Sequence, residues 1–452
     1  MFIDTHAHLF YPNFNDDVDE TIKRAKDSGV DYILVPATDL ASSAQAIQLA
    51  EKYDFIFASV GIHPHDTAEW EDSLIDQLRE MAKHEKVRAI GEIGLDYYYD
   101  FSPREKQLVA YEAQINLALE LELPIIVHNR DSNDDIMEFA RKFKETPLKA
   151  QYHCFAGSLK DARELIEMGH YVSFTGNITF KKADTLRNIV KGIDSENMLI
   201  ETDSPFLTPV PHRGKRNEPS NVKYVAEKIA ELHGLRTEDI ARTTSYNAFK
   251  LYGIGEKPML SYTYQIGNSL YINVTNRCNA DCVFCDRKGD AVIKGYNLKM
   301  SKEEEPSAET YIEEIGDPTK YDEIVFCGYG EPTIRWEVVK EVAKYVKEKG
   351  GKTRMNTDGH GNVINKRDIT PEMKGLIDTV SVSLNSVDPK QYAKLMRIDE
   401  KFHAEMLDFA KRAKGHTRVV MSIVGLSSVD TEKAKEFVTK ELGVDFRERE
   451  YF

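Results

Sequence analysis

Three cysteines stand close together in the second half of the chain, and their spacing indicates a particular chemistry. They form a C-x3-C-x2-C pattern at Cys278, Cys282 and Cys285, directly after the strand-like segment 270–275. Three thiolates can hold three irons of a four-iron cluster, whereas a structural zinc site or a ferredoxin cluster takes four protein ligands. The pattern therefore predicts a [4Fe–4S] cluster with one iron open for chemistry. A zinc knuckle is the alternative, but neither of the two remaining cysteines has ligand spacing.

The cysteine run resembles the signature of radical SAM enzymes, in which the open iron binds the amino and carboxylate groups of S-adenosylmethionine (SAM). Gly328-Tyr329-Gly330-Glu331-Pro332 is similar to the family element whose backbone receives the SAM amino group, although Tyr329 occupies a usual glycine position. The resemblance implies a 5′-deoxyadenosyl radical, an external electron donor of the flavodoxin or ferredoxin type, and a set of SAM-binding residues. That set is Phe284, Gly328, Tyr329, Gly330, Glu331, Asn356, Ser383 and Asn385.

A second group of metal-ligating side chains follows the predicted strands of the first half of the chain. The group consists of His6, His8, His63, His65, Glu92, His128, His153 and Asp203. Four imidazoles and two carboxylates suffice for two divalent cations that share a carboxylate bridge, a pair that generates hydroxide at neutral pH. This chemistry suits a phosphodiester, and amides and other esters yield to the same machinery.

The segments around these side chains resemble the TatD family of metal-dependent hydrolases, from Asp4-Thr5-His6-Ala7-His8-Leu9 to Asn247-Ala248-Phe249. By this resemblance, His6, His8 and Asp203 hold one metal, Glu92 bridges, and His128 and His153 hold the second. The residues expected to take part in catalysis are Asp203, as proton acceptor from the nucleophilic water, with Glu92, His63 and His65. Members of the family are magnesium-dependent deoxyribonucleases, but a His-rich set also accepts zinc, manganese or iron.

A basic segment, His212 to Arg216, follows the last predicted strand of the first half. Arg213, Lys215 and Arg216 are therefore candidates to bind a substrate phosphate. A solvated loop is the alternative interpretation.

The elements that must position these residues are alternating strands and helices. Eight short apolar runs separated by amphipathic stretches predict a closed (β/α)8 TIM barrel over residues 1–255. The runs are 2–5, 32–35, 55–60, 87–90, 124–127, 150–152, 170–174 and 198–200. Active sites of this fold lie at the carboxyl ends of the strands, so the His and carboxylate side chains should converge on one mouth.

A Gly- and Pro-punctuated linker is predicted at 256–264, followed over 265–452 by a partial (β/α)6 barrel of the radical SAM type. Its predicted strands are 270–274, 323–327, 352–355, 380–384, 418–424 and 444–447. Cys327 falls in a strand and Cys154 beside a ligand, and both are expected to be core residues. Since the sequence ends directly after the sixth strand, we expect the lid over the radical site to come from the other barrel, a second copy or a partner.

The composition limits which partners and which cellular location are compatible with the protein. The formal net charge of −15 argues against nonspecific binding of nucleic acid along the whole surface, although a local basic mouth remains compatible with it. No segment is long and apolar enough for a membrane span, and a strand-like start leaves no room for a signal peptide. With only five cysteines, three of them clustered, we expect a cytoplasmic protein.

Three functional hypotheses follow. In the first, both domains act on nucleic acid or nucleotides, with the hydrolase as a nuclease. In the second, both serve one small-molecule pathway, and the hydrolase cleaves an ester or amide. In the third, the cluster domain is a redox or SAM sensor that regulates the hydrolase. The substrate of the radical chemistry and the oligomeric state stay open.

Overall fold

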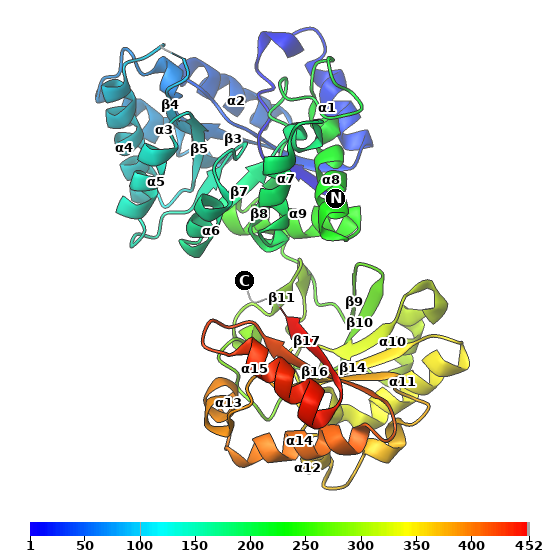
Figure 1. Cartoon of the computed structure of the whole chain (residues 1–452). Coiled ribbons are helices and arrows are strands. Elements are labelled where there is room, and N and C mark those ends of the chain that lie inside the picture. Colours follow the sequence, from blue (N-terminus) through cyan, green and yellow to red (C-terminus); the bar gives the residue numbers. More distant parts are fainter. Residues whose placement is uncertain (100, 450–452) are drawn as a thin grey trace. The chain divides into compact units, whose positions relative to one another are not determined.

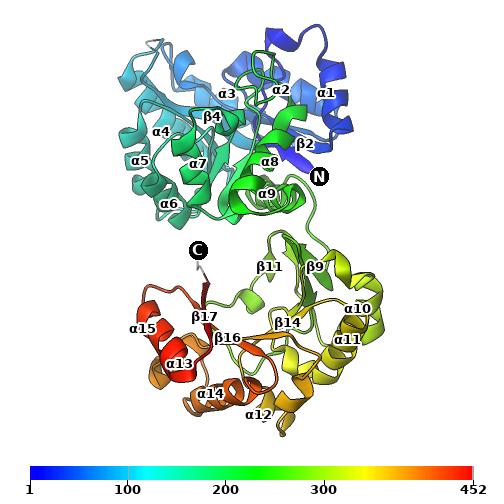
Figure 2. The ribbon, with the colours of Figure 1, turned by 45° about the vertical axis from the view of Figure 1, so that its right-hand side comes forward.

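The chain divides into two folded units, Met1–Lys257 and Pro258–Phe452. The structure is a computed structural model that describes residues 1–99 and 101–449, and Figures 1 and 2 show it from two directions. Each unit has a parallel sheet and a hydrophobic core of its own. No helix of the described residues combines the length and the apolar character that crossing a bilayer requires.

Because each unit has its own core, we predict that the first one folds alone. A fragment of residues 1–257 is expected to be monodisperse and to unfold in one cooperative transition, measured by size-exclusion chromatography and thermal circular dichroism. The matched control is a fragment of residues 1–200, which lacks the two helices α8 (Val222–His233) and α9 (Thr237–Tyr252) that complete the barrel. An insoluble 1–257 fragment beside a well-behaved full chain would contradict the prediction.

The first unit is an eight-stranded parallel barrel in which the strands follow one another in sequence order, so the predicted TIM barrel is confirmed. The seam between the last strand and the first is joined by a hydrogen bond from Thr5 N to Ile200 O and by a bridge between Ala7 and Ser204. The strands are β1 (Phe2–Asp4), β2 (Val30–Val35), β3 (Ile56–Val60), β4 (Val87–Asp96), β5 (Ile125–Arg130), β6 (Ala150–Tyr152), β7 (Tyr171–Phe174) and β8 (Met198–Ile200).

Helices surround this barrel (Figures 1 and 2). The helices are α1 (Val18–Asp27), α2 (Leu40–Lys52), α3 (Ser73–Met81), α4 (Arg104–Glu120), α5 (Asn133–Lys142), α6 (Leu159–Glu167), α7 (Asp184–Lys191), α8 (Val222–His233) and α9 (Thr237–Tyr252). Local chemistry sets where some begin. At α2, the Asp39 carboxylate accepts from Ser42 N at 2.7 Å and the Ser42 hydroxyl accepts from Asp39 N at 2.8 Å, which is a capping box.

The barrel interior is filled rather than hollow. One apolar layer comes from the strands and packs against Leu251 and Tyr252 of α9, which closes the amino end. The strand residues of this layer are Ile3, Leu34, Phe57, Ala89, Ile126 and Leu199. Chemistry is therefore confined to the opposite, carboxyl end of the strands.

The second unit is an open sheet of seven strands in the order β17-β16-β15-β14-β13-β10-β9, of which six are parallel. The predicted partial barrel is thus confirmed. The strands are β9 (Thr263–Ile266), β10 (Ser269–Asn273), β13 (Ile324–Cys327), β14 (Thr353–Thr357), β15 (Thr379–Ser383), β16 (Arg418–Val424) and β17 (Asp445–Arg449), with a separate β11 (Val292–Ile293) and β12 (Tyr296–Asn297). The helices are α10 (Ala308–Ile315), α11 (Trp336–Glu348), α12 (Gly361–Asn365), α13 (Pro389–Met396), α14 (Lys401–Ala413) and α15 (Thr431–Glu436).

The antiparallel edge strand β9 was not predicted. It begins at Thr263, inside the segment 256–264 that the sequence assigns to a linker, and pairs with β10. A sequence signal for it exists, because the two strands are joined by Gly267-Asn268, a pair typical of tight hairpins, with Gly267 at φ +55°.

Candidate active sites

One set of ligand atoms gathers where β1 and β8 end. Nε2 of His6 lies 3.1 Å from Nε2 of His8, and the two nitrogens lie 3.3 and 3.5 Å from Oε2 of Glu92. Oδ1 of Asp203 lies 3.8 and 3.6 Å from the same nitrogens. Metal–ligand bonds of about 2.0–2.2 Å separate the ligand atoms of a tetrahedral site by about 3.3 Å. The four atoms therefore have the spacing that one cation requires.

The other carboxylate oxygen of Glu92 faces a second set. Oε1 lies 2.9 Å from Nδ1 of His128, 2.9 Å from Nε2 of His153 and 3.5 Å from Nε2 of His63. The two nitrogens of His128 and His153 are 3.3 Å apart. A single buried carboxylate thus faces two groups of imidazoles with its two oxygens, which is the geometry of a bridging ligand.

The proton positions of the imidazoles fit metal ligation. Nδ1 of His8 lies 3.0 Å from the Pro36 carbonyl oxygen, so that nitrogen carries the proton and the Nε2 lone pair faces the carboxylates. Nε2 of His128 lies 3.1 Å from Oδ2 of Asp96, which leaves the Nδ1 lone pair facing Glu92. An imidazole that donates its other N–H to a carbonyl or carboxylate is the usual arrangement of a metal-bound histidine.

Two carboxylates that support the ligands were not predicted. Asp96 is fully buried, and its Oδ2 lies 2.7 Å from Nε2 of His65 as well as near His128. Glu201, also fully buried, accepts from the backbone N–H of Cys154 at 2.6 Å and lies 3.6 Å from Nδ1 of His153. The alternation of side chains along a strand could have identified Asp96, because it lies on the same face of β4 as Glu92.

Electrostatics keep the bridging group charged. Burial raises the pKa of Glu92, but the neighbouring imidazoles of His153, His6 and His63 outweigh it and hold the pKa well below its ordinary value. Burial lowers the pKa of His63 to about 4, so this imidazole is neutral at physiological pH. Burial also lowers the pKa of His6, whereas the neighbouring carboxylates outweigh burial and raise the pKa of His128 and His153. The centre therefore offers an ionised carboxylate between imidazoles of different basicity.

Exposed aromatic side chains lie beside His65 at the mouth. The rings of Tyr99 and Phe101 contact the His65 ring edge-on, with centroids 5.4 and 4.9 Å away, and they stack on each other at 5.1 Å. The Arg130 guanidinium lies 4.2 Å from the ring centroid of Tyr98. These aromatic residues follow β4, so they lie at the same end of the barrel as the ligands.

The opposite side of the mouth carries a further aromatic pair. Tyr11 stacks on His8 with centroids 4.9 Å apart and meets the ring of Phe206, in the loop after β8, at 5.8 Å. We refer to the exposed members as the aromatic rim. Its members and their exposed fractions are Tyr98 58%, Tyr99 39%, Phe101 60% and Phe206 51%.

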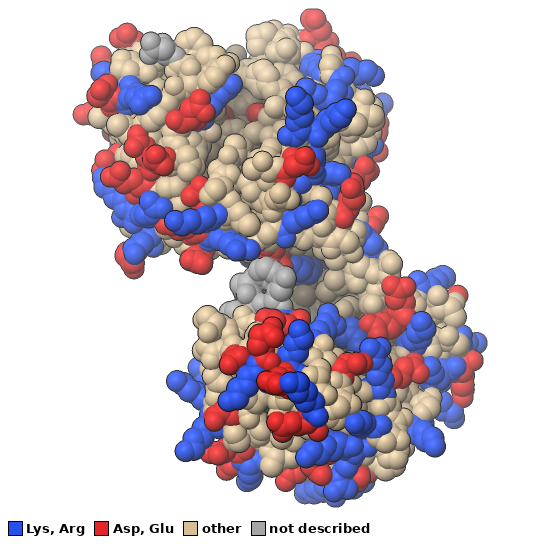
Figure 3. Space-filling model, in the orientation of Figure 1, with Lys and Arg blue, Asp and Glu red and all other residues tan. Residues whose placement is uncertain are grey.

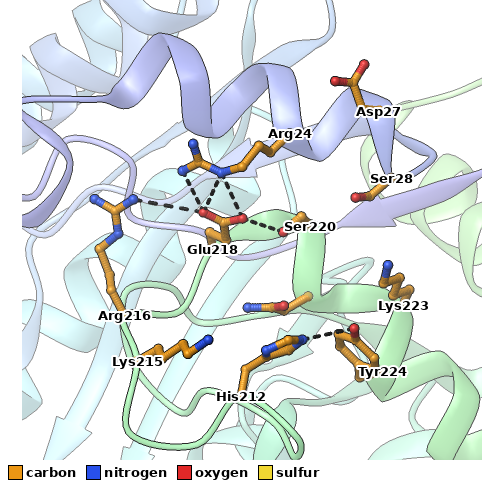
Figure 4. A pocket seen from close by; sticks show the side chains of 11 residues that line it. Arg24, Asp27, Ser28, His212, Lys215, Arg216, Glu218, Ser220, Lys223 and Tyr224 are labelled. Carbon is orange, nitrogen blue, oxygen red and sulfur yellow. Dashed lines mark hydrogen bonds and ion pairs between the residues drawn. The ribbon is translucent and has the colours of Figure 1, made fainter.

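The predicted basic residues lie in the loop after β8, which Asn217 ties to the strand end by donating to Thr202 O and Phe206 O. A groove of about 430 Å³ opens beside this loop, between α1 and the start of α8 (Figure 4). Lys and Arg side chains gather over α1 and this loop on the face drawn in Figure 3.

The three predicted phosphate-binding side chains differ in their surroundings. Arg216 donates to both oxygens of Asp17, at 2.6 and 2.8 Å, so its charge is balanced. Arg213 lies over the ring of Phe180 at 3.7 Å. Lys215, like Arg213, has no carboxylate within ion-pair distance in the described part of the chain, but it also lines the groove, which makes it the cation best placed to meet a phosphate.

The three clustered cysteines lie in the loop that follows β10. Asp281 N donates to Met396 O and Val283 N to Leu395 O, which fixes this loop to the end of α13. Burial raises the pKa of Cys282 to about 12 and that of Cys278 also. Thiolates at these positions therefore require bound cations, as iron ligation supplies.

The element 328–331 packs directly against the cysteine loop. A Cβ at position 330 would lie 2.3 Å from Thr275 O and 2.4 Å from Arg277 O, so only glycine allows this approach. The Glu331 carboxylate is buried and accepts from the hydroxyls of Thr333 and Thr357 and from Asp358 N, at 2.6, 2.8 and 2.8 Å. Glu331 thus joins the ends of β13 and β14 beneath the loop.

The other predicted SAM-binding residues lie at or after the carboxyl ends of their strands. Asn356 donates from Nδ2 to Cys327 Sγ at 3.4 Å, and Asn385 donates to Met396 Sδ at 3.1 Å. Ser383 Oγ accepts from Arg449 at 3.4 Å. The remaining members of the set make further contacts: Tyr329 donates to Val292 O, Gly328 has φ +115°, and Phe284 packs on the core of this unit.

Cys154 does not lie in a strand core, contrary to expectation. It follows β6 at φ 43°, half-buried, with Sγ 3.7 Å from the Thr175 hydroxyl. The chain turns directly after Tyr152 and directs His153 toward Glu92. Because of this turn, the alternation of side chains along β6 no longer determines where Cys154 points. Cys327 is also half-buried, at the end of β13.

Fold and site together define a metal-dependent hydrolase followed by a radical SAM domain, both of them enzymes. Residues 3–253 match the family model of the TatD related DNase, and residues 272–440 match that of the radical SAM superfamily. The chain belongs to the TatD related DNase family, with a radical SAM domain after the hydrolase. The resemblances found in the sequence are thereby confirmed.

Relatives of the first unit are similar over their whole length. The uncharacterized metal-dependent hydrolase YabD of Bacillus subtilis is 46% identical over 254 residues, which are 56% of this chain and 100% of that protein. The 3′-5′ ssDNA/RNA exonuclease TatD of Shigella flexneri is 34% identical over 56% of this chain and 98% of its own. The crystal structure of YJJV, a TatD homologue of Escherichia coli, covers 56% of this chain and 98% of that chain at 30% identity and a TM-score of 0.54.

Proposed function

We propose that the first unit binds two divalent cations across Glu92 and hydrolyses phosphodiester bonds of single-stranded nucleic acid. The bridging geometry of Glu92 carries the metal part of the proposal. His6, His8 and Asp203 would complete one ligand set, and His128 and His153 the other. Two bound cations supply an activated water and stabilise the attacking and leaving oxygens. Magnesium, manganese and zinc are all compatible with this mixed donor set.

The side chains around the cations have separable tasks. Asp203, exposed for 14% of its side chain, is open to solvent beside the ligand nitrogens and would accept the proton of the attacking water. Asp96 holds His65 and His128 in one orientation, and Glu201 supports His153. His63 and His65 would line the position of the scissile group.

The aromatic rim supports nucleic acid over a small-molecule ester or amide. Aromatic side chains stack on bases of any sequence, and stacking is the common device of single-strand binding. The 3′-5′ ssDNA/RNA exonuclease among the relatives agrees with this class of substrate. Lys215 would contribute one phosphate contact at the edge of the mouth.

The experiment compares two substrates of the metal-loaded full chain. In the double variant Tyr99→Ala/Phe101→Ala, we expect turnover of a single-stranded oligodeoxynucleotide to fall about tenfold or more, because each stacked base contributes about 1–3 kcal/mol. Turnover of bis(p-nitrophenyl) phosphate, which offers no nucleobase, should fall much less. Equal losses on both substrates would favour a small-molecule ester as the natural substrate.

We further propose that Cys278, Cys282 and Cys285 hold one [4Fe–4S] cluster and that the second unit is a radical SAM enzyme rather than a sensor. A cluster with bound SAM supplies a 5′-deoxyadenosyl radical after one-electron reduction by an external donor. The close packing of Gly330 on the cysteine loop supports this interpretation, since it places the backbone of the 328–331 element directly against the segment that carries the three cysteines. An oxygen-sensitive cluster also agrees with a cytoplasmic location.

Anaerobic reconstitution followed by an assay for 5′-deoxyadenosine separates enzyme from sensor. An enzyme produces 5′-deoxyadenosine in the presence of dithionite and SAM, whereas a sensor binds SAM without consuming it.

A further inference from the structure

The two faces of the sheet in the second unit differ in chemistry. One face packs its apolar side chains, such as Ile272, Phe326 and Met421, against the helices. The other face is polar and basic. Because side chains alternate along a strand, this polar face carries Asn356, Ser381, Ser383, Ser422 and the arginines 354, 418, 447 and 449.

Two of these arginines are neutralised within the protein. Arg354 donates to Glu323 at 2.9 Å and to Asn356 Oδ1 at 2.8 Å. Arg418 donates to Asp445 at 2.8 Å, at the amino ends of β16 and β17. A hollow of about 360 Å³ opens on this face and is lined by these two arginines, Ser381 and Arg447.

Arg449 differs from them. Its Nε is buried without a hydrogen-bond partner, its Nη2 reaches only the Ser383 hydroxyl at 3.4 Å, and no carboxylate of residues 1–99 or 101–449 lies within ion-pair distance of it. Burial lowers the pKa of this guanidinium, and Arg447 on the same face adds a second positive charge. Arg449 as a whole is half-buried, and a partly desolvated cation without a partner is costly unless an anion joins it.

The position of Arg449 is at the reacting end of the sheet. Arg449 pairs with Val424 at the carboxyl end of β17, the end from which the cysteine loop and the 328–331 element arise. Ser383, its contact, belongs to the set implied for SAM. Arg447 and Arg449 are two residues apart in β17, so both side chains point to the side of the sheet on which the hollow lies.

We propose, on the basis of the radical SAM function proposed above, that Arg449 and Ser383 bind an anionic group, a carboxylate or a phosphate, of the substrate from which the radical abstracts hydrogen. Arg447, two residues before Arg449 in the same strand, strengthens the positive potential. The planar guanidinium presents Nε–H and Nη2–H side by side, which is the geometry for two parallel hydrogen bonds to such a group. The radical substrate is therefore an acid or a phosphate ester rather than a neutral or cationic molecule.

The carboxylate of SAM is the other possible source of the anion, and one experiment separates the two. Inorganic phosphate is the probe, observed by phosphorus-31 NMR with the anaerobically reconstituted full chain. Reduction by dithionite makes the cluster paramagnetic, so phosphate bound near it gains linewidth that the oxidised, diamagnetic cluster does not produce. The measurement is repeated with S-adenosylhomocysteine, which carries the same carboxylate and is not cleaved.

We expect reduction to broaden the phosphate signal in the wild type. The broadening should saturate as the protein concentration is raised, and it should persist when S-adenosylhomocysteine is present. In Arg449→Gln the broadening should fall about tenfold, as expected for the loss of a charge-assisted pair, while Arg449→Lys retains most of it. Arg418→Gln, a paired arginine at the far end of the same face, is the matched control and should resemble the wild type.

Iron and sulfide analysis of each sample keeps the two proposals distinguishable. A wild type that holds no cluster overturns the radical function and this inference with it. An intact cluster without broadening, or with equal broadening in Arg449→Gln, overturns the anion site alone. Broadening that S-adenosylhomocysteine abolishes assigns Arg449 to the SAM carboxylate and overturns the substrate assignment. If Arg449→Gln fails to assemble a cluster, two other measurements test the anion site. They are the broadening of the phosphate signal in Arg449→Lys, and the loss of this broadening when acetate displaces phosphate from the wild type.

Discussion

Replacing any one of Cys278, Cys282 and Cys285 by Ala is expected to leave a protein that holds almost no iron–sulfur cluster. In the proposed cluster each thiolate would ligate a different iron and the fourth iron would have no protein ligand, so the loss of one cysteine would leave only two anchors. All three cysteines are half-buried, and burial raises the pKa of the Cys278 and Cys282 thiols, so water does not replace a missing thiolate easily. Iron and sulfide per chain should drop from about four to well below one.

The two remaining cysteines are the matched controls for this measurement. Cys154 belongs to the first unit and contacts Thr175, and Cys327 accepts from Asn356 at the end of β13. Cys154→Ala and Cys327→Ala should both retain a full cluster. If Cys327→Ala also lost it, the site would have four protein ligands, and simple electron transfer would replace the radical chemistry.

Replacing Glu92 by Gln should abolish phosphodiester hydrolysis. The amide removes the negative charge that both ligand sets share and turns an N–H₂ group toward one of them. Metal ions contribute several kcal/mol of transition-state stabilisation. Since each 1.4 kcal/mol is a factor of ten, we expect a loss of about a thousandfold or more in turnover. Metal analysis should show no more than one tightly bound divalent ion per chain in place of two.

Two further variants make this result specific. Glu164→Gln changes a carboxylate that forms an exposed ion pair with Arg141, so activity and metal content should be unaffected. Asp96→Asn keeps all direct ligands but loosens His128 and His65, and a loss of about 10–100-fold is expected. Wild-type activity of Glu92→Gln with two bound metals would remove the basis of the bridge assignment.

Much of this architecture could be predicted from the sequence because strand ends and ligands coincide in it. His6, His8, His63, Glu92 and Asp203 stand just after apolar runs or at their ends, so the barrel rule alone placed them at one mouth. The three cysteines carry their chemistry in their spacing. Such patterns involve residues that are close together in the sequence, so they can be recognised from the sequence alone.

The supporting residues could not be identified in this way, because their roles depend on contacts between distant segments. Asp96 gains its role from His65 and His128, which are 31 and 32 residues away in sequence. Glu201 gains its role from His153, and Phe206 joins the mouth through its contact with Tyr11 near the start of the chain. Arg216 shows the opposite case, since its charge looked available in the sequence but is paired with Asp17, about two hundred residues away.

The seam of the first barrel has a consequence for how the hydrolase assembles. Hydrogen bonds from Thr5 N to Ile200 O, from Asp203 N to His6 O and from His8 N to Ser204 O help to close it. The ligands His6 and His8 lie on one side of the seam and Asp203 on the other. A cation bound by these three side chains would link the first and last strands and would close a loop of nearly two hundred residues. The proposed ligand set is therefore incomplete until the eighth strand has docked, so a partly folded barrel would lack the proposed catalytic centre.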